Sequence, residues 1–195
     1  MKKLVFLFFL AVITIVAGCV KPLAIKPQVI NIEGVEIRLS LLDPYEWTTL
    51  SKDILVINLE ITNLRKEAIW AYPLIKSVII DSLNRQYSPL REITYQRIEP
   101  YPRFSLEFLF SSQKPPEFSL FVEFGDERKE KELVKLIEKF DLMKFKDGRI
   151  FPGATVSGIL LFYIPSYRLP GRFIIPDIYL EESMRSLTFE FIISR

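Results

Sequence analysis

The chain has 195 residues, with 26 lysines and arginines, 24 aspartates and glutamates, one cysteine and no histidine. Because histidine is absent, the sequence excludes histidine-based catalytic triads, Cys–His dyads and the usual zinc, copper and iron ligand sets. Two lysines and no acid precede the cysteine, so the remaining residues carry 24 basic and 24 acidic side chains and are formally neutral. This neutrality argues against a nucleic-acid partner.

Residues 1–18 predict a signal peptide, which we expect to form a helix. Two lysines precede a largely apolar run over residues 4–16, and two small residues then precede Cys19. A charged start, a short apolar stretch and a small-residue cleavage site are the pattern of a secretory signal, and the run is shorter than the roughly twenty residues that span a bilayer core. With cysteine at the first mature position, the segment resembles a bacterial lipoprotein signal. That resemblance implies cleavage before Cys19 and acylation of its sulfur, for example by palmitate.

A lipid on Cys19 would make the membrane a partner and place the protein in the cell envelope. Several acyl chains anchor a protein stably, because each buried methylene contributes about 0.8 kcal/mol. Residue 20 is valine rather than an acid. By resemblance to the sorting signals of two-membrane bacteria, this residue points to the periplasmic face of the outer membrane, whereas in a single-membrane host the anchor would face outward.

Residues 19–29 predict a tether between the lipid and the folded part. Pro22 and Pro27 fix backbone angles and interrupt helix or strand pairing. An extended tether would hold the domain away from the membrane surface, although a leader with no spacing role fits the same residues. The folded domain is then expected over residues 30–195.

From residue 30 onward, apolar and polar residues alternate in the way typical of half-buried β-strands. The alternation covers residues 35–41, 55–62, 104–110, 118–124, 156–164 and 187–193. A hairpin is expected over residues 75–89, with its turn at Ser82, Leu83 and Asn84. Seven or more short strands separated by turns predict an all-β fold, and specifically a β-sandwich. The 16 phenylalanines are enough to fill its core.

Residues 126–140 break this alternation and predict one inserted amphipathic helix. Leu133, Leu136 and Phe140 recur at the spacing of one helix face, and Asp126 can cap the N-terminus. Such a helix can close one end of a sandwich, or it can touch a partner or a membrane. The narrow apolar stripe and the mixed charges on the other face favour the first role.

Two stretches carry a family resemblance. Residues 55–64 predict a strand, and a predicted hairpin over residues 78–87 follows it. The hairpin matches the family at Asp81 and Tyr87, and Asn84 stands where the family has glycine. Residues 150–165 form a later strand that matches the family at Pro152, Gly153, Gly158, Phe162 and Pro165. Together they resemble the telokin-like, immunoglobulin-fold domains of bacterial secreted proteins and lipoproteins. The resemblance implies an immunoglobulin-like β-sandwich and brings no shared catalytic set.

Residues 98–124 also echo residues 150–191 in the spacing of their prolines and aromatic residues. A duplicated half-sandwich would produce this echo, and so would strands inserted into one immunoglobulin-like domain. Any two proline-initiated pairs of aromatic strands would look similar, so duplication, insertion and chance similarity all stay open at this point.

The candidate binding residues are aromatic side chains that fall outside the alternating strands. We predict that Trp47, Trp70 and Tyr72 bind a partner, and Tyr45 and Tyr101 belong to the same set. Aromatic rings with polar tips are favoured at protein interfaces and in sugar-stacking sites. The alternative is that these loops fold their rings over the open ends of the sandwich.

No cofactor or metal site is predicted. Asp43, Asp81 and Asp177 could help to ligate calcium. They are isolated in the sequence, however, whereas calcium loops place several acids close together. No pair of acids is singled out for catalysis either, so we expect no enzyme activity.

These features predict a membrane-anchored envelope lipoprotein that acts as a noncatalytic protein-interaction or assembly module, with another envelope protein as its partner. The alternative is an envelope protein that binds a glycan or small ligand and could hydrolyse it through carboxylates. A pocket that holds two suitably spaced carboxyl groups beside a tryptophan would favour the alternative.

Replacing Cys19 with alanine tests the lipid anchor. If Cys19 is the acylation site, the C19A variant expressed in a bacterial host remains uncleaved or is secreted, and it loses the membrane association that the lipid provides. Labelling with a radioactive fatty acid measures this directly, because only the wild type should take up label. Equal labelling of both proteins would contradict the lipoprotein assignment.

Overall fold

The computed structural model describes residues 27–48, 50–51, 53–97, 119–124, 127–165, 167–168 and 170–194. The expected signal peptide, Cys19 and most of the expected tether lie outside these residues, as do Tyr101, Asp126 and the strand expected over 104–110. Among the described residues, no helix combines the length and the apolar character that crossing a bilayer requires.

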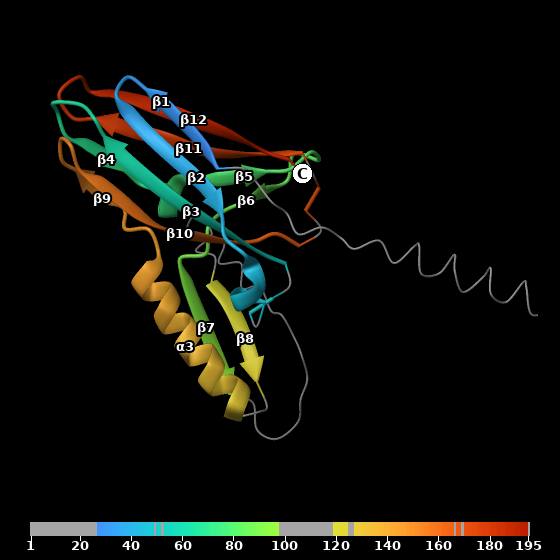
Figure 1. Cartoon of the computed structure of the whole chain (residues 1–195). Coiled ribbons are helices and arrows are strands. Elements are labelled where there is room, and N and C mark those ends of the chain that lie inside the picture. The colour runs from blue at the N-terminus through green and yellow to red at the C-terminus, as the bar shows by residue number, and fades with distance from the viewer. Residues whose placement is uncertain are drawn as a thin grey trace, which may run out of the picture.

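One layer of the fold is a four-stranded antiparallel sheet (Figure 1). Its strands lie in the order β1 (Gln28–Ile32), β2 (Val35–Leu41), β3 (Ile54–Asn63) and β10 (Thr155–Tyr163). β10 pairs with β3 along its whole length, from Thr155 opposite Thr62 to Tyr163 opposite Ile54. A late strand is thus joined directly to the first third of the chain.

The second sheet is built around β11 (Gly171–Leu180). One edge of β11 pairs with β12 (Arg185–Ile193). The other edge pairs with β5 (Val78–Ile80) and then with β4 (Ile69–Ala71), and these continue to β6 (Gln86–Tyr87) and β9 (Gly148–Ile150) respectively. A β-bulge interrupts the β11–β12 pairing between Ile175 and Ile178.

The inward side chains of these two sheets form the main hydrophobic core. Their alternation follows the sequence pattern, because successive residues of a strand point to opposite faces. The core includes Val35, Ile37, Leu39, Leu55, Ile57, Leu59, Ile61, Leu160, Phe162, Phe173, Phe189 and Phe191. Phe162 and Phe173 meet edge to face across the sheets, with ring centroids 5.9 Å apart. The described residues therefore confirm the predicted all-β class.

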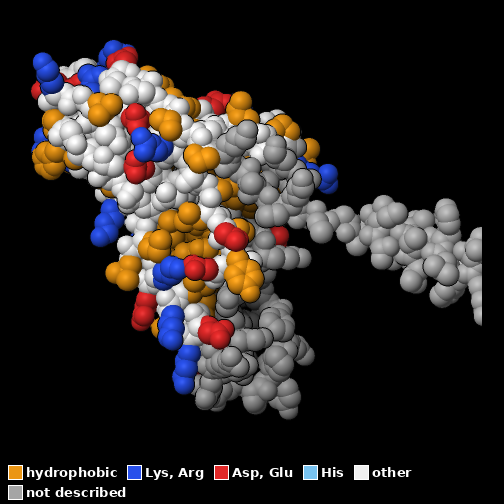
Figure 2. Space-filling view, in the orientation of Figure 1, with side chains coloured by type: hydrophobic (Ala, Val, Ile, Leu, Met, Phe, Trp, Pro, Cys, Tyr) orange, Lys and Arg blue, Asp and Glu red, His pale blue; other side chains and the backbone are white. Residues whose placement is uncertain are grey.

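The predicted helix is confirmed as α3 (Glu127–Met143), and it extends three residues beyond the expected end. It does not close an end of the two sheets. Leu133 and Phe140 pack with Val56 and Leu161 on the outer face of β3 and β10. In Figure 1, α3 lies below the sheets beside β7 (Glu92–Arg97) and β8 (Ser119–Phe124). Figure 2 shows basic and acidic side chains interspersed along the lower part of this view, as expected for a solvated helix face.

Gly158 allows the chain to return from α3 to the sheets. A Cβ atom at this position would lie 2.5 Å from the Cα of Phe145, closer than real side chains come. The Phe145 N–H donates to the carbonyl of Ile159 at 2.9 Å, and the Phe145 ring enters the main core. The strand therefore needs glycine where the returning segment crosses it.

The expected hairpin is confirmed at its turn, but its first strand is shorter than expected. β5 and β6 pair as predicted, and Asn84 has a φ of +58°, a left-handed conformation that asparagine tolerates. The segment before β5 forms the short helix α2 (Pro73–Lys76) instead of a strand.

The two described strands of the sequence echo, β8 and β12, do not occupy equivalent places in the fold. β8 pairs in parallel with β7 in a separate two-stranded sheet. The corresponding strand β12 pairs in antiparallel fashion with β11. A duplicated half-sandwich would place these two strands in similar surroundings, so the described strands argue against a duplication.

Because both faces of β10 are buried over Ile159–Phe162, we expect truncation on either face there to destabilise the protein. Leu161 and Phe162 are both 0% exposed. We expect L161A to cost about 2–5 kcal/mol and F162A about 3–5 kcal/mol in free energy of unfolding, because each leaves a cavity. Denaturant melts measure both, with I192A on the exposed face of β12 as the control that should change little. An L161A variant as stable as the wild type would show that the outer face of β10 is not packed.

Candidate binding site

A row of side chains crosses the outer face of the second sheet. Ser186 of β12 lies opposite Tyr179 of β11. Tyr179 lies opposite Trp70 of β4, and Trp70 lies opposite Arg149 of β9. Since Leu180, the neighbour of Tyr179, is fully buried, the alternation of the strand turns Tyr179 and its cross-strand partners outward. Four strands thereby contribute one side chain each to the same surface.

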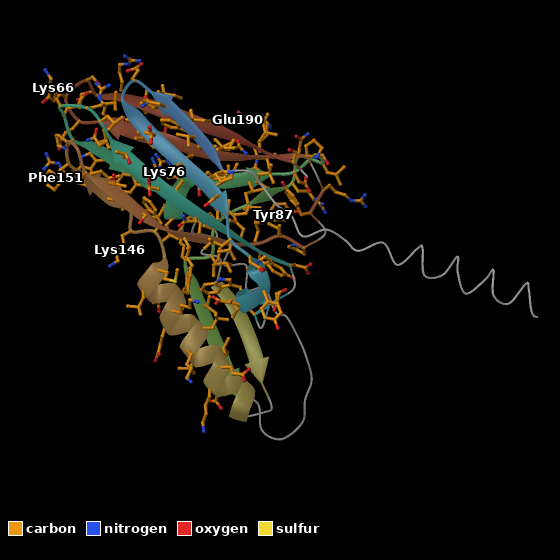
Figure 3. The ribbon with its side chains drawn as sticks, viewed as in Figure 1. Lys66, Lys76, Tyr87, Lys146, Phe151 and Glu190 are labelled. Atoms are coloured by element: carbon orange, nitrogen blue, oxygen red, sulfur yellow. The ribbon has the colours of Figure 1, made fainter. Side chains whose placement is uncertain are left out.

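Part of this row lines a hollow of about 520 Å³, which we call the aromatic hollow. Its lining consists of Trp70, Tyr72, Lys76, Asp177, Tyr179 and Ser186. Small-molecule sites in proteins commonly have volumes of about 300–1,000 Å³ and combine aromatic walls with a few polar groups. The aromatic hollow has both properties. In Figure 3, Lys76 shows where the aromatic hollow lies. Its label stands between that of Phe151, at one end of the sheets, and that of Tyr87, at the other.

Trp70 and Tyr72 form the aromatic wall of the hollow. Their rings are stacked, with centroids 6.3 Å apart and planes 10° from parallel. The residue between them, Ala71, is fully buried, so both rings lie on the outer side of the chain. Each of the two aromatic residues is only partly buried, which leaves ring surface available to a ligand.

A carboxylate from another part of the chain holds α2 beside this wall. Tyr72 occupies the N-cap position of α2 but makes no side-chain cap. Asp147 serves instead, because its carboxylate accepts hydrogen bonds from the N–H groups of Leu74 at 2.8 Å and Ile75 at 3.1 Å. Partial burial raises the pKa of Asp147, and these hydrogen bonds oppose that rise. The helix places the Lys76 ammonium over the Tyr72 ring, 5.9 Å from its centroid.

The bulge in β11 brings Asp177 to the hollow. Pro176 has no N–H to offer a neighbouring strand, and Asp177 has a φ of +53°, which is uncommon for a residue other than glycine. Bulges of this kind redirect a side chain. Here Asp177 Oδ2 lies 3.0 Å from Lys76 Nζ. Both side chains are about half exposed, so the ion pair adds little to stability and does not by itself account for the unusual backbone.

The turn between β11 and β12 orients Trp70. The indole Nε1–H donates to Glu181 Oε1 at 3.4 Å, and Arg149 Nε donates to Glu181 Oε2 at 3.2 Å. The hydrogen bond from Arg149 is the main reason that the pKa of Glu181 is lowered. The turn is held in place by the buried Glu67, which accepts a hydrogen bond from the Glu182 N–H at 2.8 Å.

The structure brings together two of the three aromatic residues predicted to bind a partner. Trp70 and Tyr72 share the aromatic hollow, and their role in binding stays a prediction. The placement of Trp47 on the surface is wrong: its side chain is 2% exposed and its ring meets Phe140 of α3 edge-on at 6.4 Å. Trp47 ends the short helix η1 (Pro44–Trp47), which α3 covers. Tyr45, in the same helix, is 79% exposed.

Sequence reasoning missed Lys76 and Tyr179, and it considered Asp177 only as a calcium ligand. Tyr179 lies in a strand, whereas the aromatic residues predicted to bind a partner all fall outside the alternating segments. Lys76 and Asp177 are 101 residues apart in the chain. They meet because β4 and β5 pair along the same edge of β11, and no local pattern indicates that register.

The three aspartates considered for calcium serve separate roles. Asp43 caps η1 by accepting a hydrogen bond from the Tyr45 N–H at 2.9 Å. Asp81 closes the β5–β6 hairpin, and Asp177 pairs with Lys76. Within the part of the chain that the structure describes, no group of three or more acids, cysteines or histidines is placed to hold a metal ion.

Asp81 is buried and fully engaged by its own hairpin. Its Oδ1 accepts hydrogen bonds from the N–H groups of Leu83 at 2.9 Å and Arg85 at 3.0 Å, and its Oδ2 accepts one from Arg85 Nε at 2.8 Å. Burial alone would raise the pKa of Asp81. The hydrogen bonds outweigh burial and lower the pKa to about 2 from an ordinary value of 3.8.

This lowered pKa predicts how the hairpin responds to acid. Because the folded-state pKa of Asp81 lies below the unfolded value, the carboxylate stabilises the fold above pH 3.8, and this contribution is lost as the pH falls toward about 2. We expect D81N to be less stable than the wild type at neutral pH, with the gap narrowing across that interval. Denaturant melts at several pH values measure the gap, and a gap independent of pH would contradict the assignment.

Comparisons with known proteins identify no family for the chain. No protein-family model matches it, and no curated protein does. A solved structure that matches is the crystal structure of a functionally unknown protein from Listeria monocytogenes EGD-e. It has a TM-score of 0.40 and 8% sequence identity, over 88% of this chain and 83% of that chain.

Proposed function

We propose that the protein is a lipid-anchored, noncatalytic binding module of the cell envelope, and that the aromatic hollow is its binding site. The observation that carries the proposal is the convergence of three partly exposed aromatic rings, an ion pair and a hydroxyl on one hollow of about 520 Å³. Sites that bind a ligand combine such rings with a few orienting polar groups.

The sequence supports the anchor. The apolar run over residues 4–16 and the small residues before Cys19 match a lipoprotein signal. The envelope location follows from that anchor, on the periplasmic face of the outer membrane if the host has two membranes. A module held at a membrane meets a partner of the same membrane at a raised effective concentration.

The architecture supports an immunoglobulin-like β-sandwich. Two antiparallel sheets share one phenylalanine-rich core. Of the residues that carry the resemblance, Asn84 lies in the turn between β5 and β6, and Gly158 lies in β10. In such folds the sheets form a scaffold, and binding residues are added on faces and loops.

The chemistry of the carboxylates supports a noncatalytic role. A hydrolase acting on glycans needs an acid whose pKa is raised, so that it can donate a proton near neutral pH. The acid bonded to the Trp70 indole is Glu181, and the hydrogen bond from Arg149 lowers its pKa. The pKa of Glu67 is likewise lowered by Arg65, and Glu67 holds a turn. Glu181 and Glu67 are engaged in structural bonds that favour their ionised forms. Asp147 has a raised pKa, but its carboxylate caps α2 and it is not among the residues that line the hollow.

A capture experiment tests the binding role. The lipidated protein is solubilised in detergent, immobilised through a C-terminal tag and exposed to envelope extract from its own host. We expect the wild type to retain an envelope component, and we expect a W70S/Y72S double variant to lose most of that retention. Y45S is the matched control, because Tyr45 is an exposed aromatic residue outside the hollow.

The melting temperature distinguishes binding from folding. Trp70 and Tyr72 are partly buried and stack on each other, so the double variant should melt at a lower temperature than the wild type but still in one cooperative transition, which shows that it is folded. Retention by the double variant equal to that of the wild type would overturn the assignment of the hollow as the binding site.

A further inference from the structure

The charges around the aromatic hollow are balanced in pairs. Lys76 is neutralised by Asp177, with their charged atoms 3.0 Å apart. Arg149 is neutralised by Glu181, with Arg149 Nε 3.2 Å from Glu181 Oε2. Neither sign of charge is in excess, so an anionic ligand such as a phosphate finds no unpaired cation among these groups. The balance favours a ligand with no net charge.

The lining nevertheless offers both hydrogen-bond donors and acceptors. The Asp177 carboxylate only accepts, the Lys76 ammonium only donates, and the hydroxyls of Ser186 and Tyr179 do both. A ligand rich in hydroxyl groups can use all four, because each of its hydroxyls is itself both donor and acceptor. An adjacent donor and acceptor, as in the Lys76–Asp177 pair, match two neighbouring hydroxyls on a ring.

The wall of the hollow adds an apolar, aromatic surface. The stacked Trp70 and Tyr72 rings are inclined by only 10°, and Tyr179 lies beside Trp70 on the next strand. A pyranose ring whose substituents are equatorial has a flat face of C–H groups, and such a face packs on an aromatic ring. The Trp70 indole N–H is bonded to Glu181, which holds the ring in a fixed orientation before a ligand arrives.

We propose that the aromatic hollow binds a neutral carbohydrate, with a pyranose ring packed against Trp70 and its hydroxyls bonded to Asp177 and Lys76. This inference rests on the proposed function, since it names the class of ligand for the same site. The bulge that gives Asp177 its positive φ then serves to place the acceptor beside the aromatic wall.

The two tryptophans provide the measurement. Trp47 is 2% exposed and belongs to the cluster under α3, whereas Trp70 lines the hollow. Iodide in solution should quench the fluorescence of Trp70 and spare Trp47. The probes are two neutral tetrasaccharides with equatorial substituents, cellotetraose and the β-1,4-linked tetramer of N-acetylglucosamine. We expect at least one of them to protect the quenchable tryptophan at millimolar concentration or below.

A pair of variants tests the polar contacts. D177N keeps the size of the side chain and tolerates a positive φ, as asparagine does, but it loses the ionised acceptor. We expect it to weaken saccharide binding about tenfold, in line with the loss of a hydrogen bond to a charged group. E190Q is the matched control and should bind normally. Glu190 is an ion-paired, exposed acid of β12 that lies outside the hollow.

Three outcomes would overturn the inference. The first is that neither tetrasaccharide protects Trp70 while capture of an envelope protein still depends on Trp70 and Tyr72; the proposed function then stands and the ligand class is wrong. The second is that D177N and E190Q bind saccharide equally. The third is that an anionic tetramer of galacturonic acid binds more tightly than both neutral probes.

Discussion

The fold depends on the burial of both faces of the β3–β10 pair. In β10, the four consecutive residues Ile159–Phe162 are all buried. Leu160 and Phe162 point into the core between the sheets, and Ile159 and Leu161 point into the cluster under α3. Full burial of each such side chain contributes about 1.5–3 kcal/mol. This strand therefore ties the two-sheet unit to the helix, and the helix in turn covers Trp47.

The aromatic hollow lies on the second sheet, on the face that points away from the first sheet and its β3–β10 pair. The cross-strand row from Ser186 to Arg149 depends on the register of β11 with its neighbours on both edges. The bulge adds the one irregular element, Asp177, at the point where β5 gives way to β4 along β11. The site is thus supported by regular strands, with its charged groups supplied by a bulge and a short helix.

Sequence patterns predicted the inward faces of the main strands well, because alternation is a local property. Ile57 and Leu59, for instance, are buried in the main core as their spacing indicates. The apolar run around Leu161 does not indicate which element covers its outer face. A strand that is buried on both faces is a continuous apolar segment in the sequence, whatever packs against it. The position of α3 could therefore not be predicted, and neither could the burial of Trp47 beneath it.

The candidate site was predictable only in part for the same reason. Trp70 and Tyr72 stand two residues apart, and their proximity is visible in the sequence. Lys76 and Asp177 meet only through strand pairing. Asp177 is also placed by a bulge, and nothing in the residues around Pro176 specifies that two residues of β11 lie outside the β11–β12 register there.

The most direct test of binding at the aromatic hollow uses fluorine NMR of the protein labelled with 5-fluorotryptophan. The two tryptophans give two resonances, and W70F assigns them. We expect solubilised envelope material from the host to shift or broaden the resonance of Trp70 and to leave that of Trp47 unchanged. A shift confined to Trp47, or no shift of either resonance, would contradict the claim that the aromatic hollow is where this protein binds.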